Sequence, residues 1–324
     1  MLPRRTKRGV EARMRVVIEG ASGYAGMELT RWLARHPAAR LVGLTSGRWE
    51  GSTAHRMTGV GGATGSLVYA RESEEETDIV FLATPAEASR DLARRWLERG
   101  ARVIDLSDAF RADSDAVYGL TEHARDALPG ARLVATPGCY PTATQLAVLP
   151  LIHAGLGAEG AGLVDAKSGV SGAGRRLDDS LLFNELDGNH HPYNVGIHRH
   201  EPEIERGLER PVLFTPHLLP TLRGLLSTVH VPVRDGVDGE AVQRALEEAY
   251  ASESLVDVVA PDRAVGIRTV GQTPMCRVAC APVVKGGFAR VFGAIDNLLK
   301  GAATQAIQNM NCVMGRPETE GLVP

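Results

Sequence analysis

The sequence has few cysteines, and the four present, at positions 139, 276, 280 and 312, form no CxxC pair. This pattern argues against a disulfide scaffold and offers no zinc-binding spacing, so we expect free thiols, a cytoplasmic protein and no metal site. No apolar run reaches the roughly 18 residues that a membrane helix needs. The formal charge of −3 lacks the basic excess that binding to a phosphate backbone requires. We therefore expect neither a membrane nor a nucleic-acid partner.

The length of 324 residues, 44% of them hydrophobic and 23% charged, is typical of a globular protein larger than one average domain. Two domains are the simplest expectation. Residues 1–13 carry five basic side chains but no apolar segment of the kind found in secretory signals. We expect this stretch to be a disordered basic extension, or translation to start at Met14, directly before the first strand.

The first half of the chain alternates short apolar runs with helical patterns. Strands are predicted over 15–19, 40–45, 78–83, 102–106 and 133–135, with a helix over 86–99. This order is typical of a doubly wound parallel sheet, the Rossmann arrangement. We assign residues 14–155 to this domain.

A glycine-rich turn follows the first strand and has the spacing G-x-x-G-x-x-G. Glycines at such a turn let the backbone approach a pyrophosphate at a helix N-terminus, where N–H groups attract negative charge. A turn that serves packing alone is the alternative. The residues predicted to contact a dinucleotide here are Gly20, Ser22, Gly23, Tyr24, Ala25 and Gly26.

The second strand ends in Ser46-Gly47-Arg48, without the acidic residue that would bond an unphosphorylated ribose. Ser46 and Arg48 can both donate hydrogen bonds to a 2′-phosphate. The segment therefore predicts a preference for NADP over NAD, unless Arg48 is only a solvated loop residue.

Longer strands, at 162–166, 225–231 and 275–281, follow residue 155, with a helix over 239–250. They indicate a second α+β domain with a mixed or antiparallel sheet, spanning 156–293. A last helix is predicted to start near residue 294 and to return to the first domain, so that residues 294–324 complete it.

Cys139 follows a strand and the turn Pro137-Gly138, and helical spacing resumes from Ala143. A cysteine at a helix N-terminus lies beside unpaired N–H groups that favour the thiolate, the nucleophilic form. The alternative is a small hydrophobic residue packed under a turn.

Seven motifs, spread in order from Met14 to the C-terminus, give the chain a family resemblance. They are the glycine turn 20–26, Asp105-Leu106-Ser107, the segments 137–142 and 166–175, His198-Arg199-His200-Glu201-Pro202-Glu203-Ile204, the segment 214–218, and 296–302. The chain resembles the N-acetyl-gamma-glutamyl-phosphate reductases. The resemblance implies a glyceraldehyde-3-phosphate-dehydrogenase-like fold, a homo-oligomer (dimer or tetramer), and NADPH-dependent reduction of the small acyl phosphate N-acetyl-glutamyl 5-phosphate in arginine biosynthesis.

The same resemblance implies roles for individual residues. Cys139 would form a thioester and His200 would exchange protons, a task suited to imidazole near pH 7. His217 is the second candidate base, followed by His198 and the pair His190-His191, and Glu203 would orient the imidazole of His200. The remaining implied contacts are Arg111 to the substrate phosphate and Ser107, Ser168, Gly169 and Asn297 to the cofactor.

One motif departs from the family pattern, because Asp108-Ala109 replaces the usual Ala then Asp. This exchange is predicted to affect loop geometry or substrate choice. Other readings are a reductase of aspartyl phosphate or of carrier-bound aminoadipyl phosphate, a nucleotide-binding sensor without catalysis, and a cysteine hydrolase, which would not require the glycine turn.

Overall fold

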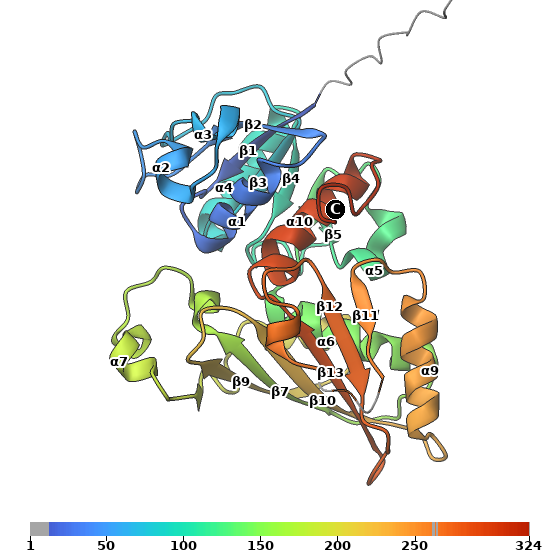
Figure 1. Cartoon of the computed structure of the whole chain (residues 1–324). Coiled ribbons are helices and arrows are strands. Elements are labelled where there is room, and N and C mark those ends of the chain that lie inside the picture. Colours follow the sequence, from blue (N-terminus) through green and yellow to red (C-terminus); the bar gives the residue numbers. More distant parts are fainter. Residues whose placement is uncertain (1–12, 261–262, 264, 324) are drawn as a thin grey trace, which may run out of the picture.

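The computed structural model describes residues 13–260, 263 and 265–323, which form two sheets with helices packed on them (Figure 1). The predicted basic extension of residues 1–13 lies outside the described residues, apart from Arg13. Among the described residues, no helix is both long and apolar enough to cross a membrane.

The first sheet is parallel throughout, and its six strands follow the order β2-β1-β3-β4-β6-β5. The strands are β1 (Met14–Glu19), β2 (Ala39–Leu44), β3 (Ile79–Leu82), β4 (Arg102–Asp105), β5 (Val117–Tyr118) and β6 (Leu133–Ala135). The helices of this half are α1 (Tyr24–Leu33), α2 (Ala54–Thr58), α3 (Gly62–Gly65), α4 (Ala86–Glu98) and α5 (Thr121–Ala124).

Helices cover both faces of this sheet, as its continuous apolar strands require. On one face α1 and the C-terminal helix α10 (Thr304–Val313) share a core with β1 and β3. On the other face α4 packs Ala93 and Trp96 against β3 and β4. The predicted Rossmann-type, doubly wound sheet is therefore confirmed.

The second sheet is mixed and has seven strands in the order β11-β12-β13-β10-β7-β9-β8. Two pairs, β7 with β9 and β11 with β12, are parallel, and the others are antiparallel. The strands are β7 (Gly162–Gly169), β8 (His191–Pro192), β9 (Val212–Leu219), β10 (Leu225–Pro232), β11 (Val256–Val258), β12 (Cys276–Cys280) and β13 (Phe288–Ile295). The predicted α+β second domain is confirmed.

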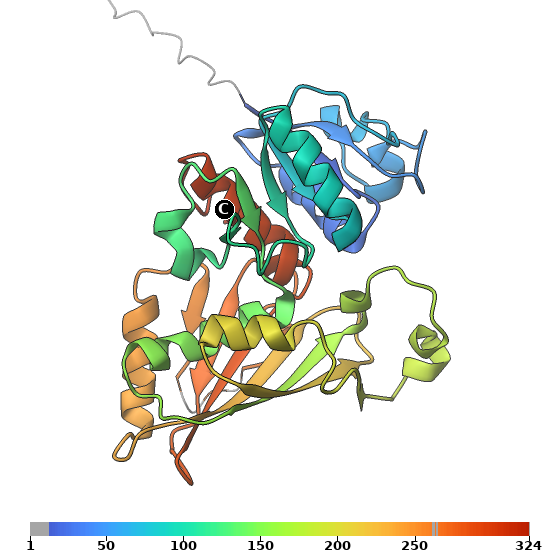
Figure 2. The ribbon, with the colours of Figure 1, turned by 180° about the vertical axis from the view of Figure 1, so that it is seen from behind.

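Three helices, α6 (Cys139–His153), α8 (Glu201–Leu208) and α9 (Gly239–Tyr250), cover one face of the second sheet, and the short helix α7 (Phe183–Leu186) lies at its edge (Figure 2). Twelve of the fifteen residues of α6 are buried, as expected of a helix that is apolar on every side. Because α6 shares its core with β7 and β10, this packing favours a domain boundary at the start of α6. The boundary at residue 155 stays a prediction.

The C-terminal segment departs from the predicted helix at its start. Ala294 and Ile295 pair with Leu226 and Leu225 as the last residues of β13, so the expectation of a helix from residue 294 is wrong. A π-helical turn, η5 (Leu299–Ala303), follows and leads into α10. The chain thereby crosses from the second sheet back to the first.

Candidate active site

Cys139 is the first residue of α6, directly after the extended residue Gly138, and no side chain caps the helix. Its side chain is half-buried. Burial raises the pKa of the thiol to about 11, although the charge of Arg111 and the backbone N–H of Tyr140 act to lower it. The backbone N–H at the helix N-terminus favours the thiolate, but burial outweighs this effect, so a base has to remove the proton.

His200 lies at the N-cap of α8 and is 5% exposed. A Cβ atom on Gly138 would come 2.4 Å from its Nε2, so the imidazole packs against the backbone that precedes Cys139. Neither ring nitrogen has a hydrogen-bond partner among the described residues. Burial, with the charge of Arg111, holds the pKa of His200 well below 6.5. The neutral imidazole keeps a lone pair with which it can accept a proton.

The other candidate histidines occupy different positions. His198 Nδ1 accepts the backbone N–H of His200 at 3.1 Å, and His191 lines the same cavity as His198. His217 instead lies on β9 with its Nδ1 3.3 Å from Asp165 Oδ1, and it lines neither of the cavities that contain Cys139. His190 is exposed.

Glu203 lies on α8 as predicted, but it does not orient His200. Its carboxylate accepts hydrogen bonds from Arg111 Nη1 at 3.0 Å, Tyr118 Oη at 2.8 Å and the backbone N–H of Gly138 at 2.9 Å. The predicted contact with the imidazole is therefore wrong. Glu203 holds the residue before Cys139, because the buried carboxylate needs N–H and O–H donors and finds them there.

Arg111 is 9% exposed and already has three acceptors. Besides Glu203, its guanidinium donates to the carbonyl oxygens of Thr136 at 2.9 Å and Leu106 at 3.0 Å. It therefore ties β6 and the loop after β4 to α8. A guanidinium has five N–H donors, so two remain for another anion.

A cleft of about 390 Å³ runs between the two halves of the molecule. Predicted site residues from both domains line it. They are Gly23, Tyr24, Ala25, Ser107, Arg111, Cys139, His200 and Asn297. Asn297 Oδ1 accepts the backbone N–H of Gly224, and its Nδ2 donates to Ser171.

Gly20 and Gly26 shape the edge of this cleft. Gly20 has φ +76°, and a Cβ there would lie 2.5 Å from the carbonyl oxygen of Ala83. A Cβ on Gly26 would lie 2.6 Å from the carbonyl oxygen of Gly20. Only glycine permits this close approach of α1 to the end of β1, and Gly23 begins α1 without a side-chain cap. The uncapped N-terminus leaves N–H donors for a phosphate.

Seven predicted cofactor residues are not among those that line the cleft, namely Gly20, Ser22, Gly26, Ser46, Arg48, Ser168 and Gly169. Ser46 is buried, and its Oγ accepts the backbone N–H of Trp49 at 3.2 Å. Arg48 is exposed and lines a separate hollow of about 300 Å³, together with Tyr24 and Arg175. Ser22 is half-buried in the glycine turn.

A second cavity of about 270 Å³ contains Ser168 and Gly169, which the sequence assigned to cofactor binding. Cys139, His200 and Arg199 line this cavity and the 390 Å³ cleft alike. The thiol and the imidazole therefore lie where two cavities meet. One cavity is open to a dinucleotide and the other has room for a small substrate. Among the described residues, no group of His, Cys, Asp and Glu is arranged to hold a metal ion.

Comparison with known proteins identifies the family. Residues 15–131 match the semialdehyde dehydrogenase NAD binding domain, and residues 139–297 match the semialdehyde dehydrogenase dimerisation domain. The N-acetyl-gamma-glutamyl-phosphate reductase of Thiobacillus denitrificans is 40% identical over 95% of this chain and 98% of its own. That of Halorhodospira halophila is 42% identical over 95% and 97%. The chain belongs to the N-acetyl-gamma-glutamyl-phosphate reductases. The family resemblance and the oxidoreductase class are therefore confirmed.

Solved structures agree with the fold of this reductase. Aspartate semialdehyde dehydrogenase II of Vibrio cholerae superposes with a TM-score of 0.77, at 21% identity over 93% of this chain and 98% of its own. The aspartate semialdehyde dehydrogenase of Candida albicans, solved with NADP, gives 0.72 at 16% identity over 93% and 100%. At these identities the likeness confirms the dehydrogenase fold alone.

Sequence reasoning gave no role to three cations that line the two cavities, Arg175, Arg176 and Arg199, of which Arg199 lines both. The side chain of Arg199 is 62% exposed and has one long contact, 3.4 Å from Nη1 to Asp108 Oδ2. The signal was its place between His198 and His200. Asp108 also lines the cleft, whereas Ala109 is buried, so the departure from the family pattern puts a carboxylate beside this cation.

Proposed function

We propose that this reductase converts N-acetyl-L-glutamyl 5-phosphate to N-acetyl-L-glutamate 5-semialdehyde with NADPH and releases phosphate, as a cytoplasmic step of arginine biosynthesis. The supporting observation is the position of Cys139 and His200 where two cavities meet. The names of relatives about 40% identical to the chain favour the acetylglutamyl substrate.

His200 acts first, as the base. The thiol of Cys139 is protonated at neutral pH because burial raises its pKa to about 11, whereas His200 is neutral because burial lowers its pKa. A stable ion pair is disfavoured by these shifts, so His200 takes the proton from sulfur while the sulfur attacks the substrate, as a general base.

The sulfur attacks the acyl carbon as it loses this proton. A carbon–sulfur bond forms, the carbon–oxygen bond to phosphate breaks, and phosphate leaves with that electron pair, which produces a thioester on Cys139. Arg199, with its exposed guanidinium in the substrate cavity, stabilises the departing phosphate. Arg111 supports the same charge with its remaining donors and otherwise holds the helix N-terminus through Glu203.

The residues around the 390 Å³ cleft suit a dinucleotide, because the tight turn made by Gly20 and Gly26 brings the uncapped N-terminus of α1, with Tyr24 and Ala25, to the cleft. Bound there, NADPH supplies the hydride that reduces the thioester. The imidazolium of His200 protonates the oxygen of the thiohemiacetal. The neutral imidazole takes that proton back as the carbon–sulfur bond breaks and the aldehyde leaves.

The preference for NADP rests on the end of β2. None of the five residues after that strand is acidic, and Arg48 is exposed beside Tyr24 and Arg175, where it can reach a 2′-phosphate. We expect Arg48→Ala to raise KM for NADP about tenfold and to change KM for NAD little. Equal effects on the two cofactors in steady-state assays would contradict the assignment.

The chain assembles as a homodimer or as a tetramer of such dimers, through the face of the second sheet that α6, α8 and α9 leave uncovered. Leu163 of β7 and Leu213 of β9 lie side by side on this face, 40% and 64% exposed, and the pair Asp165 and His217 lies further along the same two strands. Two exposed leucines side by side on an uncovered sheet face favour association with a second copy. Light scattering coupled to size exclusion tests this, and Leu213→Lys should shift the mass toward the monomer.

The direct test follows NADP reduction in the reverse direction, with N-acetylglutamate semialdehyde and phosphate. We expect phosphate-dependent turnover for the wild type and none for Cys139→Ser. Turnover with aspartate semialdehyde in place of the acetylated substrate would assign the chain to the aspartyl reaction. No turnover with either substrate would refute the proposed function.

A further inference from the structure

We propose that a buried ion pair outside the reacting groups, between Lys300 and Glu122, positions the π-helical turn η5 against Cys139 and so sets the reactivity of the thiol. This inference rests on Cys139 being the reacting group of the proposed function. It assigns a positioning role to two residues that take no part in the steps of the proposed reaction.

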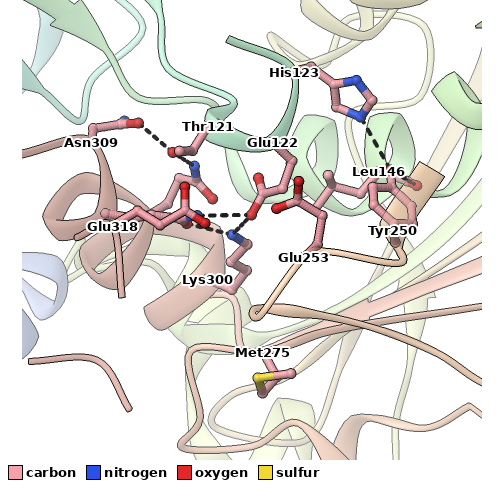
Figure 3. Close-up of polar contacts among 12 residues, drawn as sticks. Thr121, Glu122, His123, Leu146, Tyr250, Glu253, Met275, Lys300, Asn309 and Glu318 are labelled. Atoms are coloured by element: carbon pink, nitrogen blue, oxygen red, sulfur yellow. Dashed lines mark hydrogen bonds and ion pairs between the residues drawn. The ribbon is translucent and has the colours of Figure 1, made fainter. Parts of the chain in front are cut away.

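The pair lies where α5, η5 and α10 meet (Figure 3). Lys300 Nζ donates to Glu122 Oε1 at 2.5 Å and to Gln308 Oε1 at 2.7 Å, and Gln308 Nε2 donates to Glu122 Oε1 at 3.1 Å. The side chains of Lys300 and Glu122 are both 0% exposed. Burial would raise the pKa of Glu122, but the adjacent ammonium group holds it below its usual value, so the carboxylate stays charged.

A second set of hydrogen bonds joins the same elements. Gln305 Nε2 donates to Thr121 Oγ1 at 2.8 Å and to the carbonyl oxygen of Gly119 at 3.0 Å, and Thr121 Oγ1 donates to Asn309 Oδ1 at 2.7 Å. Figure 3 shows Thr121 of α5 and Asn309 of α10 directed toward one another, with Glu122 and Lys300 beside them. Lys300 therefore extends a polar network that fixes the start of α10 onto α5.

Such a pair is poorly explained by stability alone. Each buried ion loses several kcal/mol of hydration, and apolar residues of similar volume often stabilise a protein equally well or better. What a buried pair with few alternative partners does provide is a defined geometry, because any shift of the turn would leave a charge unpaired.

The turn touches Cys139. Two backbone hydrogen bonds that join residues five positions apart define the π-helical geometry. They run from Gly301 N–H to Asp296 O and from Ala303 N–H to Leu298 O, both at 3.0 Å. A Cβ on Gly301 would lie 2.7 Å from Cys139 Cβ. Gly301 and Ala302 also line the 390 Å³ cleft with Cys139. π-Helical turns are rare and frequent at functional sites. Lys300 directly precedes Gly301, which packs against Cys139. The ion pair of Lys300 therefore fixes the backbone that contacts Cys139.

The test uses the full-length protein and the double variant Lys300→Met/Glu122→Gln, which removes both charges while keeping side-chain volume and a partner for Gln308. We expect its melting temperature to stay near that of the wild type, while kcat falls about tenfold because the reacting groups are displaced. KM for NADP should rise, because the turn lines the cofactor cleft. KM for the semialdehyde should stay unchanged, because the turn does not line the substrate cavity.

A readout without substrate separates this inference from the proposed function. The rate of alkylation of Cys139 by iodoacetamide, followed by peptide mass mapping, should change at least about threefold in the double variant. The change in alkylation rate should not add to that caused by Gly301→Ala, because the added methyl group displaces the same backbone from Cys139. Arg125→Met is the matched control, because it removes ion pairs to Glu253 and Glu318 near the same junction. It should lower the melting temperature and leave the alkylation rate unchanged.

Three results would overturn the inference. The first is a double variant with the kcat and the alkylation rate of the wild type. The second is a change in alkylation rate that adds fully to that caused by Gly301→Ala. The third is an equal change in alkylation rate in Arg125→Met. If the wild type failed to turn over any substrate, the proposed function would fail, but the alkylation rates would still decide whether the ion pair positions Cys139.

Discussion

Replacing Glu203 with glutamine removes one charge from the centre of the site and keeps its shape. The carboxylate, 3% exposed, is the ion-pair partner of the buried Arg111 guanidinium and accepts the backbone N–H of Gly138. Removing one member of a buried ion pair costs about 3–5 kcal/mol, because the other charge is left uncompensated. We expect the melting temperature to fall by roughly 5–15 °C.

The kcat of the folded protein should fall as well, in addition to the loss of stability. Glutamine has one acceptor oxygen, so it cannot accept from both Arg111, on Oε2, and Gly138, on Oε1. The residue that shifts in response directly precedes or contacts the turn before Cys139, and a displacement of about 1 Å at reacting groups costs on the order of 100-fold in rate. Thermal unfolding followed by circular dichroism, together with kcat measured well below the transition, separates the two effects. Glu209→Gln, an exposed change at the end of the same helix, is the control and should change neither. A Glu203→Gln variant with wild-type stability and kcat would refute the reasoning.

Three further predictions follow from local features. Glu209 has φ +51° at the end of α8, so Glu209→Gly should raise the free energy of unfolding by about 0.4–1 kcal/mol; a loss in urea denaturation would contradict this. Because burial raises the pKa of Cys139 to about 11, alkylation of the free enzyme should accelerate up to that pH, and a plateau below pH 9 would contradict it. Burial lowers the pKa of His123 to about 4, so its contribution to stability is present above pH 6.5 and is lost as the pH falls toward 4. The melting temperature should therefore drop from pH 7 to pH 5, and less steeply in His123→Gln, which keeps a partner for Tyr250.

Elements with a strong local pattern could be predicted from the sequence. The helix over Gly239–Tyr250 has the predicted bounds, because Asp238 caps it and its apolar residues recur at helical spacing. Five strands of the first sheet are short apolar runs between turns and helices, a pattern that predicts a parallel sheet. The two-residue strand β5 was not predicted. Local sequence was less informative for β13, where Ala294 and Ile295 read equally well as the start of a helix. Pairing with β10 decides their conformation.

The site shows the same division. The backbone turns that present Cys139 and the glycine loop follow from proline and glycine in the sequence. The partner of Glu203, in contrast, depends on contacts 92 and 65 residues away along the chain, to Arg111 and Gly138. The pair Lys300–Glu122 spans 178 residues. Such distant contacts are set by tertiary packing, which no local periodicity records, and the pKa of Cys139 is likewise set by burial.

The central claim, a thioester on Cys139, is tested most directly by a burst experiment without phosphate. The enzyme is mixed with N-acetylglutamate semialdehyde and NADP, NADPH is recorded in the first turnover, and the trapped protein is mapped by mass spectrometry. The account predicts one equivalent of NADPH per active site and one acetylglutamyl group on the peptide that contains Cys139. Steady turnover without phosphate, or an acyl group on any other residue, would contradict it.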